Sequence, residues 1–358
     1  GSEMCIRDRN INNPNKAEVS WFAPLCNGDD KFIGLHDPIY KSDWKNTSNI
    51  VKRADKLGYN NILCPSSYQV GQDTMTFASA IASSTKNINL LTAIRCGEIH
   101  PPMLGRSIAT LDHILEGRLT LNIISSDLPG TSLSSELRYK RSEEVIQILK
   151  QGWTKDRINF KGEFYSIELP TDPVKTYQQN GGPLLYFGGY SPFGIDLCAK
   201  YCDVYLMWPN TINKLKTQIE NLKLKASYYN RSIEFGLRVH VIVRETESEA
   251  KAYAKKIISK IDFKKGDEII DRALDSKSLG VSLQIDLRNN ADDEYFVEEN
   301  SYDLYISPAN WGGDTFYSGY SNVVSIDESN DLGCHDYDFE FGGAIALIKR
   351  GDCQFSLK

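Results

Sequence analysis

The sequence predicts an α/β fold of the TIM (β/α)8-barrel type. Short apolar runs alternate with helical patterns from about residue 19 onwards, and this alternation is typical of a parallel sheet with crossover helices. No GxGxxG motif follows the first strand, so a dinucleotide-binding fold lacks its best support. Together the two observations favour the barrel.

The strands and helices can be placed from these patterns. We expect strands at 19–23, 61–64, 88–95, 118–124, 184–187, 203–207 and 234–246. Helices are expected at 43–57, 73–83, 102–115, 134–152, 192–201, 210–229, 248–261 and 267–274. Gly58 and Gly117 lie just beyond two of the helices and suit left-handed C-terminal caps. Lys161 and Gly162, between two β-prone runs, predict a small hairpin insertion.

Composition limits the classes of function. The chain has 358 residues, of which 41% are hydrophobic and 25% charged, so a sizeable core is available. The net charge of −6, without a long basic run, argues against nucleic acid as a partner. No apolar run reaches the ~18 to 20 residues of a membrane span and no signal peptide is recognisable, so we expect a cytoplasmic protein.

The cysteines and histidines do not follow metal-binding patterns. None of the eight cysteines forms a CxxC pair, and most are expected to be reduced thiols in the core. The five histidines are scattered, without HExxH or similar spacing. We therefore expect no metal site.

The strand predicted at 234–246 carries two side chains suited to chemistry, Arg238 and His240. Their spacing puts a cation and a titratable ring on one face, about 6 to 7 Å apart along the strand. A core histidine and a carboxylate-paired arginine would have the same pattern. In a barrel, however, the carboxyl ends of the strands carry the chemistry. The other informative residues at such ends are Asp29, Asn122, Gly188, Gly189, Ser191 and Trp208.

Several motifs, in order, resemble the alkanesulfonate monooxygenases of the bacterial luciferase-like superfamily. They are VSWFAPL, RADKLGYNNIL, SIATLDHILEGRLTLNII, LLYFGGYS, DVYLMW, FGLRVHVIVRET and ISPANW, between Val19 and Trp311. The resemblance implies a TIM barrel that uses reduced FMN as a co-substrate, supplied by a separate NAD(P)H-dependent FMN reductase. It also implies that a small anionic sulfonate reacts with O2 and the reduced flavin to give an aldehyde and sulfite. Members of the family can form homo-oligomers, so the resemblance implies that this chain can as well.

The resemblance also implies roles for individual residues. His240 matches the active-site histidine of the family, and Arg238 the arginine two positions before it, which would hold the charge of the sulfonate. The flavin would lie against Asn122, Tyr139 of the ERYE-like motif, and the turn formed by Gly188, Gly189 and Ser191, in which Tyr190 replaces a serine. Each flavin-side residue also has a purely structural alternative, as a turn cap, a surface aromatic or a tight connection.

The sequence departs from the family in three places. The family cysteine after the second strand is absent, with Val70 or Gly71 near its position. Beyond Trp311, the lid arginine, the phosphate-binding glycine turn and the eighth strand have no counterpart. The final segment, GCHDYDF followed by GGAIALIKRGDCQFSLK, instead resembles the start of a protease-associated domain. We therefore expect a barrel without its eighth strand and with a β-rich C-terminal tail.

These observations predict three segments and leave rival functions open. Residues 1–9 resemble a translated sequencing adapter or a disordered start, residues 10–312 an incomplete luciferase-like barrel, and residues 313–358 an unrelated tail. One rival is a luciferase-like monooxygenase acting on a neutral sulfur compound. Others are a truncated or chimeric barrel without catalysis and, from the tail alone, a fragment of a secreted peptidase.

Overall fold

A computed structural model of the chain describes residues 18–26, 32, 42–66, 71–208, 210–238 and 241–260, and the backbone of two further strands. In this part, a seven-stranded sheet has the order β1-β2-β3-β4-β7-β8-β9. Every neighbouring pair in it is parallel. The predicted helix at 267–274 lies outside the described residues. So do the ends of the three predicted segments, whose limits stay predictions.

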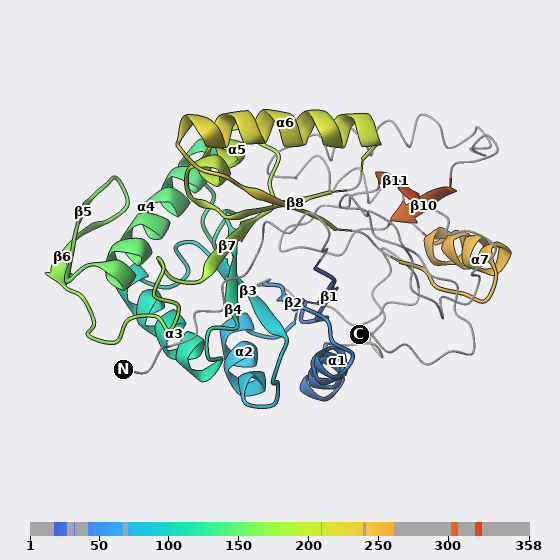
Figure 1. Cartoon of the computed structure of the whole chain (residues 1–358), viewed down its shortest axis with the longest axis horizontal. Coiled ribbons are helices and arrows are strands. Elements are labelled where there is room, and N and C mark those ends of the chain that lie inside the picture. Colours follow the sequence, from blue (N-terminus) through green and yellow to red (C-terminus); the bar gives the residue numbers. More distant parts are fainter. Residues whose placement is uncertain are drawn as a thin grey trace.

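Strands and helices alternate along the chain, and the helices lie around the sheet (Figure 1). The sheet strands are β1 (Ser20–Phe22), β2 (Asn61–Cys64), β3 (Asn89–Arg95), β4 (Leu119–Ile124), β7 (Leu184–Phe187), β8 (Val204–Met207) and β9 (Glu234–Leu237). The helices are α1 (Trp44–Lys56), α2 (Thr74–Ala82), α3 (Pro101–Ile114), α4 (Ser135–Thr154), α5 (Pro192–Tyr201), α6 (Ile212–Tyr228) and α7 (Glu247–Ile258). The predicted parallel α/β architecture is confirmed.

Two smaller antiparallel pairs accompany the sheet. The predicted hairpin is formed by β5 (Arg157–Lys161) and β6 (Ser166–Pro170), and it projects from α4 in Figure 1. The carboxylate of Glu144 on α4 fixes it by accepting the backbone N–H groups of Glu163, Phe164 and Tyr165 at 2.7 to 3.0 Å. The second pair joins β10 (Tyr302–Ile306) to β11 (Gly319–Val323) in a separate sheet.

The two faces of the parallel sheet are both apolar but pack against different partners. Alternate residues such as Ile62, Leu90 and Leu185 belong to the large core shared with the helices. The residues between them in the strands point to the other face, where a second, smaller cluster consists of Leu63, Leu91, Tyr186 and Val204. Because strand side chains alternate between faces, this second cluster marks the inner face of the sheet. Burial on both faces is the expected environment of parallel strands.

The sheet is strongly curled. Seven flat strands would place β1 and β9 about 29 Å apart, at about 4.8 Å per strand spacing. Instead the guanidinium carbon of Arg238, directly after β9, lies 5.6 Å from the ring centre of Phe22 on β1. Tyr186 on β7 also accepts a hydrogen bond from Asn61 on β2, at 3.5 Å. The sheet is therefore of the barrel type. No eighth parallel strand joins it in the part of the chain that the structure describes.

One strand is shorter than predicted. The alternating pattern suggested a strand from 234 to 246, but β9 ends at Leu237. The carbonyl of Met207, the last residue of its pairing partner β8, accepts the N–H of Arg238 at 3.0 Å. The described residues 241–246, which the alternating pattern had included, form no strand.

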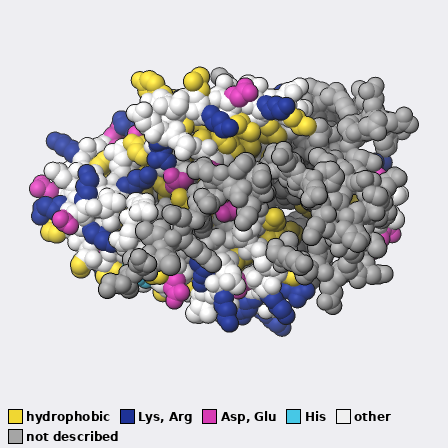
Figure 2. All heavy atoms as spheres, viewed as in Figure 1, with side chains coloured by type: hydrophobic (Ala, Val, Ile, Leu, Met, Phe, Trp, Pro, Cys, Tyr) yellow, Lys and Arg dark blue, Asp and Glu magenta, His cyan; other side chains and the backbone are white. Residues whose placement is uncertain are grey.

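Surface properties of the described part agree with the composition. No described helix is long and apolar enough to cross a membrane. Figure 2 shows hydrophobic side chains along the upper edge of one face, where α6 lies, with Lys and Arg side chains among them. Ile212, Leu224 and Tyr228 on α6 are exposed. Single apolar side chains scattered among lysines are common on solvated helices and indicate no ligand site.

Asp55 on α1 anchors the entry to β3. Its carboxylate accepts the backbone N–H groups of Lys86, Asn87 and Ile88 at 2.7 to 2.9 Å. Burial acts to raise the pKa of Asp55, but these hydrogen bonds outweigh it and hold the pKa below the ordinary 3.8. The ionised form is therefore favoured in the folded state. Its stabilising effect is present above the ordinary pKa and is lost as the pH falls through the lowered one.

We expect Asp55→Ala to lower the free energy of unfolding by about 1 to 3 kcal/mol at neutral pH, because three N–H groups lose their acceptor. The difference from the unmodified chain should shrink at a second, acidic pH below 3.8, because the stabilisation by the ionised carboxylate is lost as the pH falls through its lowered pKa. Urea unfolding at the two pH values measures it, with Asp55→Asn as the variant that keeps an acceptor without the charge. A difference independent of pH would contradict the proposed role of the ionised carboxylate.

Candidate active site

Four polar or aromatic side chains lie at the carboxyl edge of the parallel sheet. Arg95 ends β3, Asn122 lies in β4, and Trp208 and Arg238 directly follow β8 and β9. Leu121, Ile123 and the residues flanking Arg95 pack into the helix-side core, so Asn122 and Arg95 belong to the inner face. In barrels, chemistry gathers at this edge.

Arg238 is held between two aromatic rings. Its guanidinium carbon lies 4.4 Å from the ring centre of Trp208 and 5.6 Å from that of Phe22. The side chain is partly buried. Burial lowers the pKa of Arg238 well below its ordinary value, while the nearby Tyr190 acts in the opposite direction. A partly desolvated cation with a planar fork of donors is suited to binding an anion.

Tyr190 connects Arg238 and Trp208 with the turn after β7. Its hydroxyl oxygen accepts the backbone N–H of Trp208, and its ring packs edge-on against Tyr205 at 6.3 Å between ring centres. The hydroxyl of Tyr205 in turn donates to the carbonyl of Gly189 at 3.0 Å. The tyrosine that replaces the family serine therefore has a structural partner at the edge of the site.

The turn from Gly188 to Ser191 leads into α5 and lies against Tyr139 of α4. A Cβ on Gly189 would lie 2.8 Å from the ring of Phe187 and 3.0 Å from the Tyr139 hydroxyl. One on Gly194 would also lie 3.0 Å from that hydroxyl, and one on Gly188 would lie 3.2 Å from the carbonyl of Leu206. The backbone approaches this closely only because glycines occupy these positions.

Ser191 is the N-cap of α5. Its hydroxyl oxygen accepts the N–H of Gly194 at 3.1 Å, and Pro192 begins the helix. A helix N-terminus carries a partial positive charge and attracts phosphate groups. The structure thus brings three of the predicted flavin-side residues, Tyr139, Gly189 and Ser191, to one place.

Of the predicted site residues Asn122 and His240, the structure describes only the first. Asn122 is buried on the inner face, paired in register with Ala93 and Tyr186. His240 lies outside the described residues, as does Asp29. The pairing of Arg238 with His240 therefore stays a prediction, although Arg238 follows β9 rather than lying inside it.

Arg95 is the residue at this edge that the motifs did not single out. It is 4% exposed, and its place at the end of the apolar run LLTAIR is the signal that could have found it. Arg238 ends the run FGL in the same way. A charged side chain that closes an apolar strand on its inner face must have buried partners.

Metal binding and thiol chemistry have no support in the described residues. No group of three or more His, Cys, Asp or Glu side chains among them is placed to hold a metal ion. Five cysteines are buried and free, as predicted for core thiols: Cys26, Cys64, Cys96, Cys198 and Cys202. Burial raises the pKa of Cys64 and of Cys96 to about 12. Such thiols are almost entirely protonated at neutral pH and poorly reactive.

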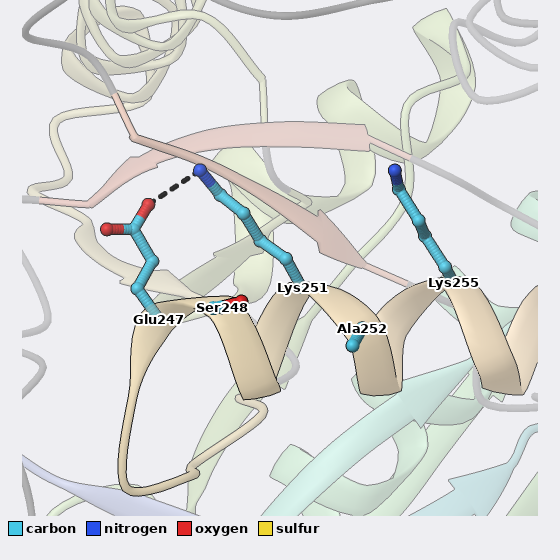
Figure 3. A pocket seen from close by; sticks show the side chains of 5 residues that line it. All are labelled: Glu247, Ser248, Lys251, Ala252 and Lys255. Atoms are coloured by element: carbon cyan, nitrogen blue, oxygen red, sulfur yellow. Dashed lines mark ion pairs between the residues drawn. The ribbon is translucent and has the colours of Figure 1, made fainter.

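A shallow hollow along α7 does not resemble an active site. Figure 3 shows that its side chains all come from one helix, with an ion pair between Glu247 and Lys251 at 2.6 Å. Ser248, Ala252 and Lys255 complete the lining. An active site in this fold is instead built from the ends of several strands.

Comparison with known proteins decides the family. Residues 18–294 match the family model described as luciferase-like monooxygenase. The chain belongs to the luciferase-like monooxygenases. The chain is therefore an enzyme of a flavin-dependent monooxygenase family, and the resemblance at the level of this superfamily is confirmed.

Two relatives carry a more specific name. The chain is 52% identical over 285 residues to a sulfoquinovose monooxygenase from Agrobacterium fabrum (strain C58 / ATCC 33970), covering 79% of this chain and 74% of the relative. It is 45% identical over 291 residues to a sulfoquinovose monooxygenase from Novosphingobium aromaticivorans, covering 79% and 80%. These names differ from the alkanesulfonate monooxygenases suggested by the motifs.

A solved structure supports the fold of this luciferase-like chain. The long-chain alkane monooxygenase LadA matches with a TM-score of 0.59 at 19% identity, covering 68% of each chain. At this identity the match concerns the fold alone, and it agrees with the curled parallel sheet. The likeness of the tail to a protease-associated domain is not supported by these comparisons and stays a prediction.

Proposed function

We propose that this luciferase-like monooxygenase removes sulfite from an organosulfonate and that sulfoquinovose, a sulfonated hexose, is its substrate. The names of the two relatives, at 52% and 45% identity, support this substrate. The motifs had suggested simple alkanesulfonates. Both kinds of molecule carry the same anionic sulfonate beside the carbon that is oxidised, and they differ in the polar hydroxyl groups of the sugar.

The observation that carries the proposal is the position of Arg238. Its guanidinium lies over Trp208 at 4.4 Å, partly removed from water, at the edge of the barrel where substrates bind. A guanidinium can donate two parallel hydrogen bonds to sulfonate oxygens, as it does to phosphate or carboxylate. Arg238 would thereby orient the substrate, while the rings of Trp208 and Phe22 keep water away from the ion pair.

Reduced FMN is the proposed co-substrate, and the residues present fit it. The glycine turn packs its backbone closely against Phe187 and the Tyr139 hydroxyl, which brings that hydroxyl beside the N-terminus of α5, and this N-terminus at Ser191 suits a phosphate. Asn122 would contact the flavin from β4. Bound reduced flavin supplies two electrons to O2, and the overall reaction breaks the C–S bond to release sulfite, an aldehyde and water.

The remaining roles are also proposals. His240 would hold and return the proton needed during oxidation at the carbon that bears the sulfonate. A separate NAD(P)H-dependent FMN reductase would supply the reduced flavin. A homo-oligomeric state and a cytoplasmic location stay predictions from the sequence.

Sulfite release tests the proposal. The purified chain is incubated with a flavin reductase, NADH, FMN and O2, and sulfite is measured with sulfoquinovose, an n-alkanesulfonate and a dialkyl sulfone. We expect sulfite from the sulfonates, with a higher kcat/KM for sulfoquinovose. Oxidation of the sulfone alone would favour the neutral-substrate rival. No saturable quenching of tryptophan fluorescence by reduced FMN would favour a barrel without catalysis.

A further inference from the structure

We propose that Arg95 is a positioning residue that joins the loops at the carboxyl ends of β2 and β4 and thereby keeps the flavin-side residues in place. The inference rests on the proposed function, since it concerns the same site. It goes beyond that function by assigning a role to a side chain that contacts neither of the proposed ligand groups.

The contacts of Arg95 reach both neighbouring loops. Its Nη1 donates to the hydroxyl of Ser126 and, at 3.1 Å, to the carbonyl of Asp127, both in the loop after β4. Its Nη2 donates to the carbonyl of Ser66, after β2, at 3.4 Å. One planar group therefore bridges the loops on either side of β3.

The loop after β1 belongs to the same arrangement. Burial raises the pKa of the Cys26 thiol in that loop, and the charge of Arg95 opposes the rise. The carbonyl of Leu25 accepts the N–H of Gln72 at 2.9 Å, which joins the loops after β1 and β2 directly. The loop after β1 is thus joined to the loop after β2, whose Ser66 carbonyl accepts a hydrogen bond from Arg95.

Two more arginines donate hydrogen bonds to the same short segment after β4, residues 125–127. Arg138 Nε donates to the carbonyl of Ser125 at 3.1 Å, and Arg141 Nη2 donates to that of Ser126 at 3.1 Å. Both arginines are buried on α4. Burying three cations around one short segment is costly, and backbone carbonyl acceptors offset part of that cost. Apolar side chains would fill the same space with less penalty, so the arrangement is better explained by positioning than by stability.

The segment connects directly to two proposed flavin contacts. The segment follows directly on Ile124, the last residue of β4, and β4 is the strand that carries Asn122. Tyr139 lies between Arg138 and Arg141 on α4, so a shift of the segment would also shift the helix turn that presents the Tyr139 hydroxyl to Gly189. Removing the hydrogen bonds of Arg95 should therefore displace both flavin-side residues, Asn122 and Tyr139, while leaving the hydrophobic core intact.

Arg118 provides a matched control at the opposite edge of the same sheet. It directly precedes β4. Its Nη1 donates to Thr85 Oγ1 at 3.1 Å and to the carbonyl of Ile88 at 2.8 Å, and its Nη2 donates to the carbonyl of Thr85 at 3.2 Å. Like Arg95, it makes three hydrogen bonds that join neighbouring loops, but at the amino ends of the strands.

The test compares Arg95→Gln and Arg95→Lys with Arg118→Gln and Arg118→Lys in the full chain. Thermal unfolding reports stability, anaerobic quenching of tryptophan fluorescence reports the Kd for reduced FMN, and hydrogen exchange reports the opening of residues 121–133. We expect both Gln variants to lose stability. Only the Arg95 variants should raise the Kd at least tenfold and speed exchange in that segment. Arg95→Lys should not restore binding, because a single ammonium cannot bridge both loops as a planar fork does.

Equal changes in Kd for the Arg95 and Arg118 variants would overturn the proposal, because loss of stability alone would then explain them. So would unchanged exchange of residues 121–133 in Arg95→Gln. If Arg95→Gln does not fold, Arg95→Lys decides in the same way. If the unmodified chain does not bind reduced FMN, the proposed function fails, and the exchange comparison of Arg95 with Arg118 still decides whether Arg95 holds the loops.

Discussion

Arg238→Ala is expected to lower kcat/KM for the sulfonate substrate by about 30-fold or more. Truncating one partner of a buried, hydrogen-bonded charge pair costs about 2 to 5 kcal/mol, and each 1.4 kcal/mol corresponds to a factor of about ten. Arg238 is positioned to bind the sulfonate in the ground state and the transition state alike, so most of the loss should appear as a higher KM. Steady-state sulfite release measures both constants.

Arg244 is the matched control for Arg238. Its guanidinium also stacks on an aromatic ring, 3.7 Å from the ring centre of Tyr253, but it is exposed and lies just before α7. Arg244→Ala should leave kcat/KM unchanged. Arg238→Lys, which keeps the charge without the planar fork, should fall between Arg238→Ala and the unmodified chain. An unchanged KM in Arg238→Ala would mean that the sulfonate binds elsewhere.

Gly189→Ala is expected to raise the Kd for reduced FMN by about tenfold to 100-fold. The added methyl carbon would lie 2.8 Å from the ring of Phe187 and 3.0 Å from the Tyr139 hydroxyl, closer than carbon atoms pack. Relief of such overpacking costs about 1 to 3 kcal/mol and displaces the neighbouring groups. Because Tyr139 and the glycine turn itself are proposed flavin contacts, the cost should appear in the affinity for the flavin.

Gly152→Ala separates this effect from a general effect of adding a methyl group. A Cβ there would meet Ile158 at 3.7 Å, an ordinary contact, and alanine favours the helix by up to about 1 kcal/mol. Gly152→Ala should leave the Kd unchanged, as measured by anaerobic fluorescence titration. An equal rise in both variants, or no rise in Gly189→Ala, would remove the glycine turn from the proposed flavin site.

Local signals predicted most of the strands and helices well. The predicted limits of β2, β7 and α5 coincide with those observed, because Pro65, Gly188 and Pro192 mark ends that the backbone chemistry of proline and glycine imposes. Alternation failed at β9, where the apolar pattern continues through VIVRET but the strand stops. Whether an apolar run extends a strand depends on a neighbouring strand being there to pair with it, which is not a local property.

The sequence by itself determined the parallel α/β architecture, the hairpin at Gly162, the family and the nature of its candidate residues. Only the tertiary structure decided what those residues touch. A Cβ at Gly162 would lie 2.4 Å from the Glu144 carboxyl group, Tyr190 accepts the N–H of Trp208, and Arg95 joins loops 29 to 32 residues away along the chain. Periodicity and turn chemistry act between near neighbours in the chain and can be read from it. These contacts join segments that meet only when the strands pair and α4 packs beside them, so no local pattern encodes them.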